Sequence, residues 1–149
     1  MAHTMWNPAD RQAILIRFGS LSADARPTWG KLDAPRMVAH VTDTLRWSIG
    51  ELSVAPMKKS PIGLWPVNVL IMFYLPWPKG VPTAPELVER NPSEWKSELD
   101  SLRGAIDRFV ARDVMGSWTP HVAFGRITGE QWGRLTYRHL DHHLTQFGA

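Results

Sequence analysis

The sequence contains no cysteine in its 149 residues. This absence excludes disulfide bonds, thiolate metal sites and cysteine nucleophiles. Any metal ligands in this protein must therefore be nitrogen or oxygen atoms. A thiol that takes part in a reaction here must come from a small molecule.

Long hydrophobic runs are also missing. The longest apolar stretch, 64–77, contains prolines and is too short to span a bilayer. The first residues, "MAHTMWNPADRQ", lack the basic region followed by an apolar core that a signal peptide needs. We therefore expect a cytoplasmic protein that does not bind membranes.

The net charge is +3, but the sequence contains no run of basic residues. Lysines and arginines are spread along the chain and often stand beside Asp or Glu. A nucleic-acid-binding protein usually carries a basic stripe with interleaved aromatic residues. The charge pattern therefore predicts that nucleic acid is not a partner.

Helix signals dominate what the sequence does contain, and no segment alternates as a strand would. A chain of 149 residues fits one domain, 1–149. Start signals occur at Asn7 before Pro8, at Asp33, at Asn91 in "NPSE" and in the Thr128–Gln131 capping box. Gly148 supplies a stop for the last helix. The predicted helices are 8–20, 34–53, 92–113 and 128–147, with a short extra helix at 64–75.

These elements predict an all-α fold, a four-helix bundle with one short extra helix. The extra helix is hydrophobic nearly all round, which indicates that it is buried or lies at a subunit contact. A proline-rich connector, 75–87, follows it.

The last helix ends in "HLDHHLTQFG", at 139–148. On a helical wheel, His139 and His143 fall within an apolar stripe with Trp132 and Leu135, while His142 lies on its flank. Their i, i+4 spacing lets both rings reach one metal ion. A pair of hydrogen-bonded core histidines would give the same pattern, so spacing alone leaves both interpretations open.

A third ligand has to come from elsewhere in the chain. His3 lies in an N-terminal segment expected to be loose, and His121 lies in the loop "TPHVAFG". His40 lies in the second helix, at the margin of its apolar stripe and on the side of Trp47 and Glu51. This position suits the space between helices, and it would equally suit a surface histidine.

Three segments, taken in order, resemble a branch of the DinB/YfiT-like superfamily over about residues 28–148. They read "TWGKLDAPRMVAHVTDTLRWSIGEL", "PKGVPTAPEL" and "HVAFGRITGEQWGRLTYRHLDHHLTQFG". The resemblance implies a four-helix bundle with a divalent transition metal, often zinc or nickel, held by three histidines. Carried over by position, these ligands are His40, His139 and His143. In this branch the loop before the last helix usually reads H-P-x-F-G. Val122 replaces that proline here, which puts a shared role for His121 in doubt.

The resemblance also implies chemistry, because better-known members of the superfamily are thiol-dependent transferases and isomerases or metal-dependent hydrolases. We therefore expect an enzyme whose metal activates a small thiol or water against a small electrophilic substrate. Gln146 would orient a ligand or a water held by the metal, and Glu51 would act as an acid or base. Both also fit ordinary roles, Gln146 as a polar helix-end residue and Glu51 as a solvated glutamate.

Other residues near these positions have mainly structural interpretations. Trp47 and Trp132 would line a substrate site or simply pack in the core, and Asp43 and Asp141 are expected at the surface. Bundles of this kind often dimerise, so the sequence is compatible with a homodimer but does not fix the oligomeric state. The alternative to an enzyme is a non-enzymatic, stress-associated bundle that binds the same metal through the same ligands.

Overall fold

Five α-helices build the protein, as a computed structural model shows for residues 1–58, 61–77 and 83–149. Part of the proline-rich connector, 78–82, lies outside the described residues, as do 59–60. The helices are α1 (Pro8–Ser20), α2 (Ala34–Ser48), α3 (Val67–Phe73), α4 (Trp95–Val110) and α5 (Gly129–Gln146). Two 3-10 turns, η1 (Pro61–Gly63) and η2 (Pro85–Leu87), flank α3 in the chain. The described residues contain no strand, so the all-α prediction is confirmed.

Three of the predicted helix starts are confirmed by their caps. The Asn7 side chain accepts a hydrogen bond from the Ala9 amide, and Asp33 caps α2 in the same way. At α5, Thr128 and Gln131 form the reciprocal capping box. These caps satisfy amides that would otherwise lack partners at the first turn of each helix.

The predicted start of α4 at Asn91 is wrong. The helix begins at Trp95, and the Glu94 side chain caps it. Ser93 lies before the helix. Its amide and its hydroxyl both donate to the buried Glu98 carboxylate, at 2.7 and 2.9 Å. The end of α2 is also earlier than predicted, since Gly50 follows it with a φ of +81°. That backbone conformation ends a helix and favours glycine.

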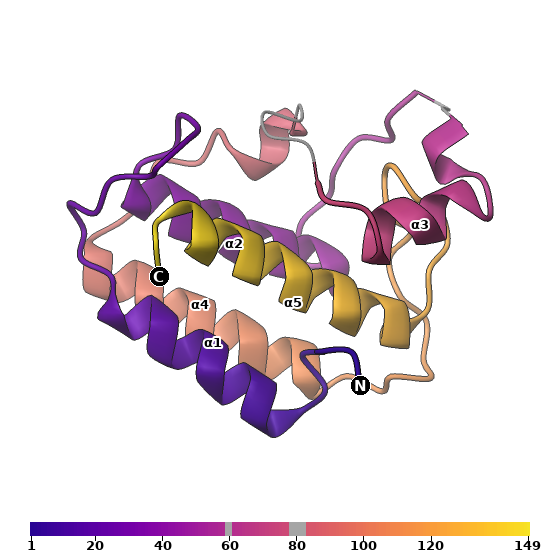
Figure 1. Cartoon of the computed structure of the whole chain (residues 1–149), viewed down its shortest axis with the longest axis horizontal. Helices are drawn as coiled ribbons and strands as arrows, with labels where there is room; N and C mark the ends of the chain where they lie inside the picture. The colour runs from indigo at the N-terminus through magenta and orange to yellow at the C-terminus, as the bar shows by residue number, and fades with distance from the viewer. Residues whose placement is uncertain (59–60, 78–82) are drawn as a thin grey trace.

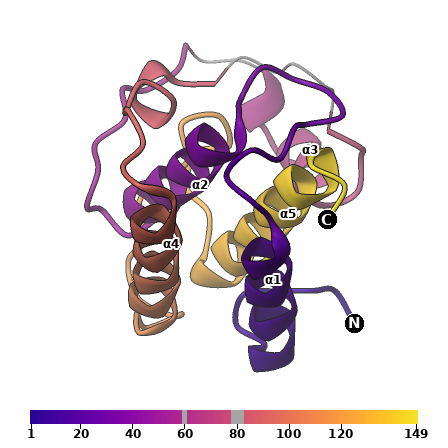
Figure 2. The ribbon, with the colours of Figure 1, turned by 90° about the vertical axis from the view of Figure 1, so that its left-hand side faces the viewer.

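The four long helices run side by side and enclose the core (Figure 1). Helix α2 packs against α4 and α5, and α1 packs against α5 and α4. Figure 2 shows α4 below α2 on one side and α1 below α5 on the other. The largest fully buried side chains include Trp132, Phe18, Phe109, Met37, Leu45, Ile106, Leu140 and Leu144. The packing of α2 on α5 brings the histidines of both helices to one place.

Helix α3 is only partly buried, so the first alternative of the sequence prediction is wrong, and a subunit contact stays a prediction. Met72 packs into the core, but Trp65 and Tyr74 are 80% and 67% exposed. Leu64, Val67, Leu70 and Leu75 are also exposed on this segment. Apolar composition predicted burial here, whereas the chain by itself leaves most of these side chains open to solvent.

Candidate metal centre

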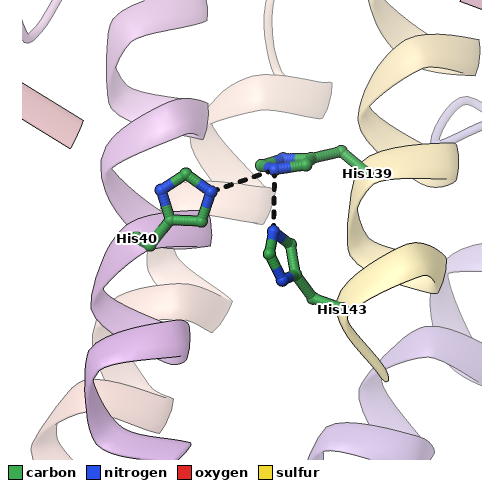
Figure 3. Close-up of side chains that lie close together, drawn as sticks. All are labelled: His40, His139 and His143. Atoms are coloured by element: carbon green, nitrogen blue, oxygen red, sulfur yellow. Dashed lines mark hydrogen bonds between the residues drawn. The ribbon is translucent and has the colours of Figure 1, made fainter. Parts of the chain in front are cut away.

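Three histidines converge at the contact between α2 and α5 (Figure 3). His40 comes from α2, and His139 and His143 come from successive turns of α5. The Nε2 atom of His139 lies 3.1 Å from Nε2 of His40 and 3.1 Å from Nε2 of His143. Within residues 1–58, 61–77 and 83–149, no other group of three or more His, Asp or Glu residues gathers in this way. The structure therefore brings together the three residues predicted as ligands.

A backbone carbonyl fixes the ring of His40. Its Nδ1 lies 2.9 Å from the carbonyl oxygen of Leu87, at the end of η2. Because a carbonyl can only accept, His40 must carry its proton on Nδ1 and donate it there. Its Nε2 therefore presents a lone pair to the other two histidines.

The same reasoning fixes His143. The Gln146 amide nitrogen donates to the carbonyl of Trp29 at 2.6 Å, which sets the orientation of the amide group. Its oxygen then faces Nδ1 of His143 at 2.9 Å and accepts the proton from it. Gly30 leaves room for this arrangement, because a Cβ there would lie 2.2 Å from the Gln146 amide nitrogen. Nε2 of His143 also presents a lone pair.

The three facing nitrogens cannot all be satisfied by hydrogen bonds among themselves. His40 and His143 each direct a lone pair inward, so His139 alone can bring a proton, and it has only one at Nε2. Two lone pairs then compete for a single donor. A buried acceptor without a donor costs about 1–3 kcal/mol. A cation among the three atoms would satisfy every lone pair at once.

Burial keeps these imidazoles uncharged at neutral pH. It lowers the pKa of His40, and it lowers the pKa of His143 to about 3. Burial also lowers the pKa of His139, and the two neighbouring histidines lower it further. Neutral imidazole is the form that binds metals, so the ligands need not lose protons first.

The spacing of the nitrogens also fits a metal. Metal–nitrogen distances of 2.0–2.1 Å in a tetrahedral site imply ligand nitrogens about 3.3 Å apart. The two contacts of His139, at 3.1 Å each, are close to that separation. All three ligand atoms lie within 4.8 Å of one another, so a small adjustment of the rings would let them hold a divalent metal.

A buried ionic network supports the segment that carries the Leu87 carbonyl. Arg90, three residues further along, donates to Asp43 of α2 at 2.9 Å and to Glu98 of α4 at 2.7 and 3.0 Å. Asp43 is 2% exposed, so its expected surface position is wrong. Asp141 is half exposed and pairs with Arg17 at 2.6 Å, as a surface residue would. Arg90 thus ties α2 and α4 to the chain beside His40.

Glu51 does not join the histidines. Its carboxylate accepts two hydrogen bonds from Arg108 of α4, at 2.7 and 3.1 Å, and lies 3.8 Å from Arg46. Gln146 does lie at the site, but both ends of its amide are engaged. Its hydrogen bond to His143 is compatible with the expected ligand-orienting role, which stays a prediction.

Trp47 and Trp132 pack in the core, with 3% and 1% exposure. Their rings lie 5.2 Å apart, and each also contacts the ring of His121. Nδ1 of His121 accepts hydrogen bonds from the amides of Ala123 and Phe124, at 3.1 and 3.2 Å. Burial lowers its pKa to about 3. The loop therefore holds this ring firmly without the usual proline.

Sequence reasoning missed the two carbonyls that set the histidine tautomers, those of Leu87 and Trp29. A backbone acceptor leaves no trace in residue type, so no motif could have revealed them. His3 was expected in a loose segment, yet its Nδ1 lies 2.7 Å from Asp10 and its ring stacks on Tyr137. Asp10 was visible only as an acid in the first helical turn.

Comparison with known proteins gives one family. The model of the family "Protein of unknown function (DUF1569)" matches residues 55–149, nearly two thirds of the chain. The matched part contains His139 and His143 but not His40. No curated protein and no solved structure shows significant similarity to the chain. Among the described residues, no helix is both long and apolar enough to cross a membrane.

Proposed function

The chain belongs to this family of proteins of unknown function, and we propose its function from the histidine site. The protein is a metal-dependent enzyme that acts on a small electrophile. His40, His139 and His143 would hold one divalent transition metal, zinc or nickel, since both accept imidazole ligands. When bound, the ion would activate a small thiol or water as the nucleophile. With a thiol as the nucleophile the protein would be a thiol transferase, and with water it would be a hydrolase.

The proton arrangement at the histidines carries the proposal. Leu87 and Gln146 take the Nδ1 protons of His40 and His143, which leaves two inward lone pairs and one proton. A histidine cluster held only by hydrogen bonds would need a donor for each acceptor. Metal-binding histidines typically donate the N–H of their other ring nitrogen to a carboxylate, a backbone carbonyl or water, and the Leu87 carbonyl is such a partner for His40.

The number of ligands supports catalysis over a purely structural site. Structural zinc sites usually have four protein ligands, whereas catalytic sites have three and keep a position open. Three histidines gather here among the described residues. The protein's own contribution is to hold the rings of His40 and His143, through the Leu87 carbonyl and the Gln146 amide, so that their Nε2 lone pairs would bind the metal.

The proposal extends to the fold family, a DinB/YfiT-like four-helix bundle. One ligand from the second helix and two from the last, spaced H-x-x-x-H, match what that resemblance implies. The mutual packing of α1, α2, α4 and α5 is compatible with a bundle. Helix α3 would be the extra element.

Turnover of a thiol with an electrophile tests the proposal. The metal-loaded protein is mixed with low-molecular-weight thiols and 1-chloro-2,4-dinitrobenzene, and in parallel with an activated ester for hydrolysis. We expect a rate above the uncatalysed one that disappears on chelation, returns with zinc or nickel, and is absent in His40→Ala. A metal-loaded protein that accelerates neither reaction would contradict the enzyme and favour the metal-binding module.

A further inference from the structure

Of the three histidines, His139 is the one that keeps the most surface open to solvent. His40 and His143 are 5% and 9% exposed, whereas His139 is only partly buried. A molecule that reaches the three Nε2 atoms therefore passes beside the ring of His139. The residues around that ring decide what kind of molecule fits.

Three aromatic side chains extend outward from His139 through successive ring contacts, and we call them the aromatic rim: Trp77, His142 and Trp29. The Trp77 ring centroid lies 6.1 Å from that of His139 and 5.8 Å from that of His142. Trp29 meets His142 edge-on at 6.1 Å. All three are partly buried, so each keeps some ring surface open to solvent.

The rim is fixed in place by the same residues that build the site. The Trp77 indole nitrogen donates to the carbonyl of Ile71 at 3.0 Å, so this ring has no donor left for a ligand. The backbone of Trp29 is anchored by its carbonyl, which accepts from the Gln146 amide behind His143. What Trp77 offers a ligand is therefore ring surface, held in position beforehand.

The charge near Trp77 narrows the class of ligand. Arg138 places its guanidinium 4.9 Å from the Trp77 ring centroid and bonds the carbonyls of Ile71, Met72 and Leu75. Aromatic cages bind cations through the faces of their rings. Here a cation already lies against Trp77, so a second positive charge is disfavoured. A flat, uncharged ring suits this surface better.

We propose that the thiol substrate of this site carries an uncharged aromatic ring, which stacks against the aromatic rim while its sulfur reaches the three histidines. This inference rests on the proposed function and adds the substrate class to it. Trp77 and Trp29 are specificity-determining residues in this account. They recognise the ring and take no part in the chemistry.

Thiol binding to the cobalt(II)-loaded protein tests this assignment without relying on turnover. Cobalt(II) accepts imidazole ligands and gives a charge-transfer absorption band when a thiolate binds it. Benzyl mercaptan and 2-mercaptoethanol are titrated separately and their dissociation constants compared. We expect benzyl mercaptan to bind about tenfold more tightly to the wild type.

Matched variants separate rim stacking from general hydrophobicity. Trp77→Leu and Trp29→Leu should each reduce the preference for benzyl mercaptan to about threefold or less. Trp65→Leu is the control, because Trp65 is 80% exposed and lies outside the rim, and it should keep the full preference. Thermal unfolding followed by circular dichroism checks that each variant is folded. Because there are two rim variants, the test still works if one of them does not fold.

The outcomes distinguish this inference from the proposed function. Equal affinity for the two thiols in the wild type, or a preference that both rim variants retain, would overturn the substrate class and leave the metal chemistry standing. If cobalt binds but neither thiol produces the band, the thiol chemistry fails, and the inference is overturned with it.

Discussion

A buried imidazole offers either a lone pair or a proton at Nε2, and the partner of Nδ1 decides which. At His40 and His143 the partners are oxygens that can only accept, the Leu87 carbonyl and the Gln146 amide oxygen. Both rings therefore turn lone pairs inward. This detail, more than the closeness of three histidines, distinguishes a metal site from a hydrogen-bonded polar cluster.

At the residue scale, Gln146→Ala should weaken metal binding although all three ligands remain. Losing the acceptor for Nδ1 frees the His143 ring to rotate and to change tautomer, and partners of this kind are worth about 10–100-fold in metal affinity. Competition with a chromophoric chelator measures the change. Thr145→Ala, an exposed neighbour on α5, is the control, and an equal loss of affinity in the two variants would contradict the orienting role.

The two α5 histidines were predictable from sequence, and their oxygen partners were not. His139 and His143 stood out because two polar rings one turn apart lay within a stripe containing Trp132 and Leu135. The Leu87 carbonyl comes from a short turn 47 positions away in the chain. Only the packing of η2 against α2 brings it to His40. Local spacing carries no information about such a contact.

At the scale of elements, caps explain where the helices begin and where prediction failed. Asn7, Asp33 and Thr128 cap helices as their sequence signals indicated. Asn91 has the same signal but does not cap, because the chain after it turns to bind Glu98 through Ser93. Hydrogen bonds to Glu98, five residues further along the chain, thus override the start signal at Asn91.

Thr128→Ala should lower the free energy of unfolding by about 1 kcal/mol, because it removes the acceptor for the first turn of α5. Asn91→Ala, which removes the same kind of signal without a cap, should change it by no more than about 0.5 kcal/mol. Urea unfolding of both variants measures the difference. Equal destabilisation would show that Asn91 does cap α4.

For the whole molecule, one ionic network joins the parts that surround the site. Arg90 connects Asp43 of α2 with Glu98 of α4, and Glu98 also holds Ser93. Burial by itself raises the pKa of Glu98, but hydrogen bonds from Arg90 and Ser93 outweigh it and hold the pKa below its ordinary value. The apolar pattern of the sequence predicted the packed core. It did not predict this network, because charged residues are usually expected at the surface.

The network makes stability depend on pH. Ionised Glu98 stabilises the fold at pH values above its unfolded-state pKa of about 4.3, and that contribution is lost as the pH falls toward the lower folded-state pKa. Glu98→Gln should cost about 3 kcal/mol at pH 7, at the low end for a buried pair because Arg90 is partly exposed. The free energy of unfolding of Glu98→Gln should then fall less steeply than that of the wild type between pH 5 and pH 3. This range spans about two pH units around the unfolded-state pKa of Glu98.

Urea unfolding across this pH range measures both slopes. Asp100→Asn on the same helix is the control. The side chain of Asp100 is 63% exposed, and its Oδ2 lies 3.8 Å from Nζ of Lys96. This variant should stay within about 0.5 kcal/mol of the wild type. A Glu98→Gln variant with the same acid sensitivity as the wild type would show that the network does not control acid stability.

Metal content tests the central claim most directly. Untagged protein, purified without chelators and then incubated with zinc or nickel, is dialysed and measured by elemental analysis for wild type, His139→Ala and His142→Ala. The three-histidine site predicts about one metal ion per chain in the wild type and in His142→Ala, and almost none in His139→Ala. A wild-type protein that retains no metal, or a His139→Ala variant that retains as much as the wild type, would contradict it.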